Sequence, residues 1–278
     1  EARMQHAING VTLHWRDAGA GEPVVFIHGF PFRSTMWAPQ FEAIPAGWRF
    51  IAPDLRGFGA SERGSALMSI DLFADDIVAL LDHLEIEQAV ICGLSMGGYV
   101  TLSLVSRYPH RVRGVVLVAT RASSDSEEGI KARFELAMRV RNSGVDVVVQ
   151  SMLPKVLAGN TSIQHPEVVE FVRNMMATTA PETVAGALIA MAHRPDYRDM
   201  LHRIDVSAMI VRGDQDQIIA REEMDLLTRM VRGAKYEVVP NVGHMPNLEA
   251  PDVFNTLLIN FLNFLPPAVR IGDLTLNF

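Results

Sequence analysis

A run of apolar, β-favouring residues stops at a serine that glycines surround. Residues 90–99 read VICGLSMGGY, and 93–97 fit the pattern G-x-S-x-G where a buried strand should meet a helix. Such a sharp turn holds the serine in strained dihedral angles, so the neighbouring positions must lack bulky side chains. The turn lifts Oγ of Ser95 clear of the sheet. It also points the first N–H groups of the next helix at that oxygen, where they favour an oxyanion.

Short apolar runs alternate with helical patterns along most of the chain. Apolar residues follow one helical face in 70–84 and 251–262, while Asn9-Gly10 predicts a tight hairpin between 3–8 and 11–16. The short runs suit strands that are buried on both faces, as in parallel sheets. They lie at 23–27, 49–52, 89–92, 115–118, 208–211 and 236–239. The alternation predicts an α/β fold with a mostly parallel central sheet flanked by helices.

Residues 121–200 interrupt this alternation. They show helical patterns broken by Gly and Pro, no convincing strand, and six of the 14 methionines. We interpret this segment as an inserted helical cap on a core formed by residues 1–120 and 201–278. A set of ordinary surface helices is the alternative, because methionine also serves as core filler. At the other end, alternating apolar residues in 270–278 predict a strand that could pair at a sheet edge or across a homodimer.

Composition limits the partners and the compartment. The 278 residues carry a formal net charge of −7 without any Lys/Arg-rich run, which argues against nucleic acid. No apolar run approaches the roughly 18 residues that span a bilayer, so we expect no membrane partner. The single cysteine, Cys92, excludes an internal disulfide, and the first ten residues lack the pattern of a signal peptide. We expect a cytoplasmic protein; the sequence leaves open whether an N-terminal segment was removed.

Two further strand ends supply the groups that activate a serine. VRGDQDQII at 211–219 places carboxylates after one strand, and NVGHMPNLEAP at 241–251 places His244 on a glycine-flanked loop. A carboxylate that accepts a hydrogen bond from an imidazole fixes its tautomer. The chain order Ser, Asp, His is the order of the α/β-hydrolase architecture.

An early strand end supplies the expected oxyanion donors. In FIHGF at 26–30 the histidine and glycine bring the backbone close to the serine, so the N–H of Phe30 would act beside the N–H of Met96. His28 precedes the serine in the chain, and we expect it to bond the loop backbone rather than to act as the base.

The sequence resembles the α/β-hydrolase fold family over nearly its whole length. The matching pieces are HGF at 28–30, PDLRGFGAS at 53–61, GLSMGG at 93–98, GDQD at 213–216 and GHMPNLEAP at 243–251. By motif, the resemblance implies that Ser95 is the nucleophile, His244 the base and Asp216 the acid. Asp214 is the chief rival for the acid, and Asp125 is a third candidate. GLSMGGYV and the methionine-rich cap look most like the 3-oxoadipate enol-lactonase and small carboxylesterase branch.

The resemblance implies a serine hydrolase that cleaves carboxylic esters or lactones through an acyl-enzyme, with no metal or organic cofactor. The nine histidines show no HExxH or other ligand spacing. We expect an apolar pocket lined by the cap and by loop residues that include Phe32, Trp37 and Met245. An acidic lactone would require an arginine at the site, and the sequence does not separate the candidates. These are Arg33, Arg121 and Arg133.

Three alternatives use the same fold. A perhydrolase or cofactor-free haloperoxidase would use the same three residues with peroxide in place of water. A C–C bond hydrolase of diketones would share the triad as well. A non-catalytic ligand-binding member is disfavoured, because a pure binder has no reason to keep a triad and both oxyanion loops.

Overall fold

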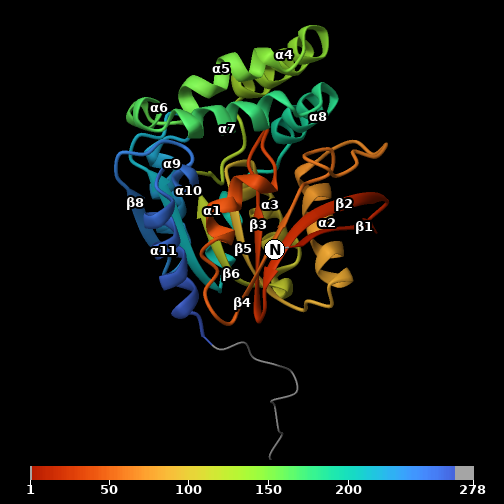
Figure 1. Ribbon diagram of the computed structural model, residues 1–278. Coiled ribbons are helices and arrows are strands. Elements are labelled where there is room, and N and C mark those ends of the chain that lie inside the picture. Colours follow the sequence, from red (N-terminus) through yellow and green to blue (C-terminus); the bar gives the residue numbers. More distant parts are fainter. Residues whose placement is uncertain (1, 267–278) are drawn as a thin grey trace, which may run out of the picture.

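An eight-stranded sheet runs through the centre of the molecule, with helices against it (Figure 1). The computed structural model describes residues 2–266, so the strand predicted at 270–278 lies outside the described residues. The strands are β1 (Ala2–Ile8), β2 (Val11–Gly19), β3 (Glu22–Ile27), β4 (Trp48–Pro53), β5 (Ala89–Leu94), β6 (Val112–Val118), β7 (Ser207–Gly213) and β8 (Lys235–Val239). The six short apolar runs all became strands, β3 to β8, and the fold class is confirmed.

The strand order brings the carboxyl ends of β3 and β5 side by side. The order is β1-β2-β4-β3-β5-β6-β7-β8, and among the described strands only β2 runs against the others. From β3 the chain first moves to one side, to β4, and then returns past β3 to β5. Ligands of open α/β sheets bind at such a switch point, outside the carboxyl ends of the strands. Here the loops after β3 and β5 meet, and these loops carry Phe30 and Ser95.

The helices fall into two groups. Figure 1 shows α4 to α8 gathered at one end of the sheet, whereas the other helices lie along it. The first group is α4 (Glu127–Ser143), α5 (Asp146–Val156), α6 (Gly159–Gln164), α7 (Pro166–Ala177) and α8 (Pro181–Ala192). The second is α1 (Ala38–Phe41), α2 (Ile70–His83), α3 (Met96–Arg107), α9 (Arg221–Met230), α10 (Pro246–Glu249) and α11 (Pro251–Asn263), with short 3-10 helices at Ser34–Trp37, Pro109–Arg111 and Arg198–Arg203. The segment 121–200 contains no strand, as its pattern predicts.

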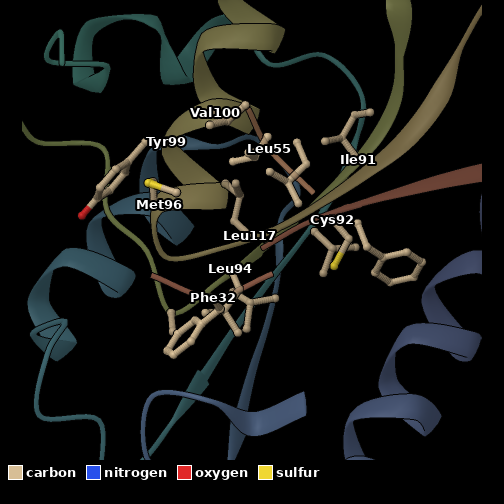
Figure 2. Packing of buried hydrophobic residues seen from close by; sticks show 14 of the residues in the cluster. Phe32, Leu55, Ile91, Cys92, Leu94, Met96, Tyr99, Val100 and Leu117 are labelled. Atoms are coloured by element: carbon tan, nitrogen blue, oxygen red, sulfur yellow. The ribbon is translucent and has the colours of Figure 1, made fainter. Parts of the chain in front are cut away.

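Local chemistry explains the main turns and the core. Asn9 and Gly10 both have positive φ, 48° and 80°, which is the geometry of the predicted hairpin between β1 and β2. The core around β5 is apolar on both faces: Figure 2 shows Ile91, Cys92 and Leu94 beside Leu117. Burial raises the pKa of the Cys92 thiol, so it stays protonated and unreactive.

Within residues 2–266 no helix is long and apolar enough to cross a bilayer.

Candidate active site

Ser95 occupies a strained turn between β5 and α3. Its φ is 54° and its ψ is −111°, a conformation that a side-chain-bearing residue adopts only when its surroundings enforce it. A Cβ on Gly93 would lie 2.2 Å from the carbonyl oxygen of Gly97, and one on Gly97 would lie 2.1 Å from that of Ile27. Neither backbone oxygen can move aside. The glycines around the serine are therefore required by close packing, as the pattern predicts.

His244 and Asp216 form a buried pair. Nδ1 of His244 lies 2.9 Å and 3.1 Å from the two carboxylate oxygens of Asp216, and both side chains are almost completely buried. Because a carboxylate only accepts, Nδ1 carries the proton and Nε2 is left free to take another. Burial opposes ionisation of Asp216, but His244 and the backbone N–H groups of Ile218 and Ile219 outweigh it and lower the pKa of Asp216.

The two rival acids lie elsewhere. Asp214 is exposed, and its backbone N–H donates to Val239. Asp125 is buried and accepts from three arginines. Neither carboxylate bonds to His244 within the described chain, so Asp216 is the one acid in hydrogen-bond contact with the imidazole.

A second buried carboxylate, Glu249, holds the loop that carries His244. Oε1 of Glu249 accepts from the N–H groups of Gly243 and Met245 at 3.0 Å and 3.1 Å, one on each side of the histidine. Oε2 accepts from the N–H of Ala158 at 2.8 Å and from the hydroxyl of Thr161 at 2.7 Å. Glu249 thus ties the histidine loop to the start of α6. Nothing in the sequence singles Glu249 out, since one glutamate in a loop motif carries no signal of four convergent donors.

Two backbone N–H groups near Ser95, those of Phe30 and Met96, donate no backbone hydrogen bond within residues 2–266. Met96 is the first residue of α3, so its N–H has no acceptor within the helix. The N–H of Phe30 donates to no backbone acceptor within residues 2–266. His28 steadies this loop: Nδ1 donates to the carbonyl of Gly29 at 2.9 Å, and Nε2 accepts the N–H of Leu55 at 3.0 Å. His28 is therefore bonded to loop backbone, as expected, and burial lowers its pKa.

Ser95, His244 and Phe30 line a single cavity of about 400 Å³. This volume lies in the range of about 300–1,000 Å³ that is typical of small-molecule sites. Among the described residues no hydrogen bond joins Ser95 to His244; hydrogen bonds between a nucleophile and its base often tighten only in the complex with substrate. Tyr99 and Leu188 also line this cavity.

Three expected pocket residues belong to the core instead. Phe32, Trp37 and Met245 are completely buried, and none of them lines the cavity. Phe32 lies beside Leu94 in Figure 2, and Trp37 packs against Phe26 with a centroid separation of 5.1 Å. That expectation is corrected: these side chains point into the packing beneath the loops, so they never reach the opening above the strand ends.

Helices α4, α5 and α8 supply much of the wall, and they separate the arginine candidates. Arg121 and Arg133 line the cavity, whereas Arg33 lines a different pocket. Lys155 on α5 also lines it and was not anticipated. Only the packing of these helices brings them to the site, and no pattern in the sequence reports that packing.

Among residues 2–266 no three His, Cys, Asp or Glu side chains gather as ligands of a metal would.

Comparison with known proteins agrees with this architecture. The model of the α/β-hydrolase fold family matches residues 22–251. A protein of Synechocystis sp. that carries a non-heme chloroperoxidase name is 30% identical over 262 residues, 91% of this chain and 95% of that one. The 3-oxoadipate enol-lactonase 2 of Acinetobacter baylyi is 29% identical over 249 residues, 90% of each chain. The solved structure of a thermophilic esterase from Thermogutta terrifontis, with malate bound, is 35% identical with a TM-score of 0.91, covering 95% of this chain and 98% of that one. The chain belongs to the α/β-hydrolase fold family, a family of hydrolases with esterase and lactonase members.

Proposed function

We propose that this protein is a serine hydrolase that cleaves carboxylic esters or lactones through an acyl-enzyme, with Ser95, His244 and Asp216 as its catalytic triad. The hydrogen bond between His244 and the buried carboxylate of Asp216 carries the proposal, because His244 lines the same cavity as Ser95. The esterase and enol-lactonase relatives support the same reaction class.

The proposed reaction has two steps. Nε2 of His244 takes the proton from Ser95 as Oγ attacks the ester or lactone carbonyl, and Asp216 stabilises the imidazolium that forms. The N–H groups of Phe30 and Met96 bind the oxyanion, and each such donor contributes about 2.7–4 kcal/mol of transition-state stabilisation. His244 then protonates the leaving alcohol oxygen. It next deprotonates a water that attacks the acyl carbonyl and releases the acid from Ser95.

We further propose that residues 121–200 act as a cap on a core of residues 1–120 and 201–278. Three helices of this segment contribute side chains to the cavity wall, among them Arg133 of α4, Lys155 of α5 and Leu188 of α8. In this arrangement the core supplies the reacting groups, and the helical segment shapes the space for the substrate.

Perhydrolysis is the second candidate, because one relative carries a chloroperoxidase name. Peroxide would replace water in the second step and yield a peracid from the same acyl-enzyme. Peracid formation from acetate and hydrogen peroxide, compared with hydrolysis by the same preparation, measures which acceptor the site prefers.

The experiment is a hydrolysis panel of p-nitrophenyl esters and simple lactones with two serine variants. We expect Ser95→Ala to lose turnover by at least about 10³-fold while it stays folded, because the nucleophile is gone. Ser151→Ala is the matched control, since Ser151 lines the same cavity but its hydroxyl donates to Val148. Turnover retained by Ser95→Ala would place the nucleophile elsewhere. Wild-type protein that hydrolyses no ester or lactone would favour the non-catalytic alternative.

A further inference from the structure

The wall of the cavity carries an excess of positive charge. Arg121 follows β6, Arg133 lies on α4 and Lys155 lies on α5, so three separate elements each bring one cation to the same space. No Asp or Glu of the described chain lines the cavity. The whole protein has a formal net charge of −7, so the local sign is the opposite of the overall one.

The carboxylate beneath this wall does not neutralise it. Asp125 accepts from Arg121 and Arg133 at 2.5 Å each and from Arg194 at 2.9 Å, so three guanidinium groups share one negative charge. Arg194 is fully buried against the ring of Tyr99. Burial opposes ionisation of Asp125, but its bonds to Arg194 and Arg133 lower the pKa of Asp125 to about 2. The cluster therefore keeps a positive excess at neutral pH.

The cations that face the cavity retain unused donors. A guanidinium has five N–H donors. Arg121 uses Nη2 on Asp125 and also interacts with the hydroxyl of Tyr99, while Arg133 uses Nε on Asp125 and Nη1 on the sulfur of Met191. Their side chains are 27% and 22% exposed. Lys155 is exposed and forms no ion pair with any residue from 2 to 266.

One other carboxylate acts on this cluster from outside. Glu223 accepts from the hydroxyl of Ser123 and lies close enough to interact electrostatically with Arg121. It does not line the cavity, so it leaves the donors that face the cavity open to a ligand.

We propose that Arg121, Arg133 and Lys155 bind a carboxylate of the substrate, so that the enzyme prefers esters or lactones that carry a second, ionised carboxyl group. The proposal rests on the proposed function, because it specifies the substrate class of the same site. Guanidinium groups pair with carboxylates through parallel N–H···O bonds, which fix the orientation of the substrate as well as its affinity. A cationic wall in an acidic protein also concentrates anions at the cavity mouth.

The test compares matched charged and neutral esters. Monomethyl succinate carries a carboxylate near neutral pH, whereas methyl 4-oxopentanoate has a methyl ketone in its place at nearly the same size. We expect kcat/KM of the wild-type enzyme to be at least about 10-fold higher for the anion, since hydrogen bonds to charged groups contribute about that factor or more. Raising NaCl from about 50 mM to about 500 mM should lower kcat/KM for the anion alone.

Variants assign the preference to residues. We expect Lys155→Met and Arg133→Met each to lower the ratio of kcat/KM for the anion to kcat/KM for the neutral ester by about 5- to 10-fold. Arg139→Met and Lys131→Met are the matched controls, because both residues lie on α4 and are exposed outside the cavity. Turnover of the neutral ester reports that each variant is folded.

The results that would overturn the proposal separate the subsite from the hydrolase activity. Equal kcat/KM for the two esters in the wild-type enzyme would refute the carboxylate subsite while leaving the hydrolase intact, as would an anion preference that survives both cavity variants. Failure on both esters by enzyme that hydrolyses the p-nitrophenyl panel would also refute the subsite, whereas failure on the panel as well would refute the proposed function.

Discussion

Replacing Glu249 by glutamine would separate two roles of one buried carboxylate. Its Oε1 meets two backbone N–H groups, from Gly243 and Met245, which cannot become acceptors. Its Oε2 meets the N–H of Ala158 and the hydroxyl of Thr161, and a hydroxyl can turn to accept. The glutamine oxygen should therefore stay on the histidine loop, and the NH2 group should face α6.

The magnitude follows from that orientation. The N–H of Ala158 loses its acceptor, and an orphaned buried donor costs about 1–3 kcal/mol. The bonds that remain become neutral and roughly half as strong. We expect Glu249→Gln to lower the free energy of unfolding by about 2–4 kcal/mol and kcat/KM by less than about 10-fold. Glu249→Leu has no acceptor at all, and releasing the loop around His244 should lower kcat by about 100-fold wherever the variant remains folded.

Urea denaturation measures the stability of each variant, and ester hydrolysis below the unfolding transition measures kcat. Glu222→Gln is the matched control, because Glu222 is exposed in the first turn of α9, where the loss of its charge should cost less than about 1 kcal/mol and leave kcat unchanged. The reasoning fails if the glutamine variant unfolds within about 0.5 kcal/mol of the wild type, or if the leucine variant keeps the wild-type kcat.

Three further predictions concern the triad, the serine turn and the oxyanion loop. Asp216→Asn should lower kcat by about 10⁴-fold and Asp214→Asn by less than about 3-fold in the same ester assay, because only Asp216 bonds to His244; the reverse ranking would move the acid to Asp214. Gly97→Ala should abolish activity and destabilise the fold, because the added Cβ would lie 2.1 Å from the carbonyl oxygen of Ile27. Gly159→Ala should do neither, because its Cβ would meet nothing within 4 Å. Equal melting temperatures of the two variants would contradict this. Burial lowers the folded pKa of His28 below the unfolded value of 6.5. The stabilising effect of His28 is therefore complete above pH 6.5 and is lost as the pH falls through the folded pKa. Urea unfolding at successive pH values should show that the free energy of unfolding falls less on acidification for His28→Gln than for the wild type.

The sequence predicted the parts of this site that local geometry dictates. Strand ends, a glycine-flanked serine and the hairpin at Asn9 each follow from dihedral and packing demands within a few residues. The motif favours Asp216 over Asp214, and Asp216 is the one that lies within hydrogen-bond distance of His244.

The sequence could not predict what long-range packing decides. Trp37 and Met245 belong to the segments expected at the site, yet their side chains are buried in the core. The sequence of such a segment does not indicate which of its side chains the rest of the fold covers. Arg33 and Arg133 look equivalent in the chain, and only the placement of α4 brings the second to the cavity. Glu249 has four donors that come from two segments far apart in the chain, and only the fold brings them together.

The central claim is that the hydroxyl of Ser95 is activated by His244. Its most direct test is to treat the protein with diethyl p-nitrophenyl phosphate and to locate the adduct by peptide mass spectrometry. The account predicts one diethylphosphoryl group on Ser95, loss of esterase activity in proportion to labelling, and no labelling of a His244→Ala variant at the same reagent concentration. An adduct on another residue that tracks the loss of activity, or full labelling of Ser95 without His244, would contradict it.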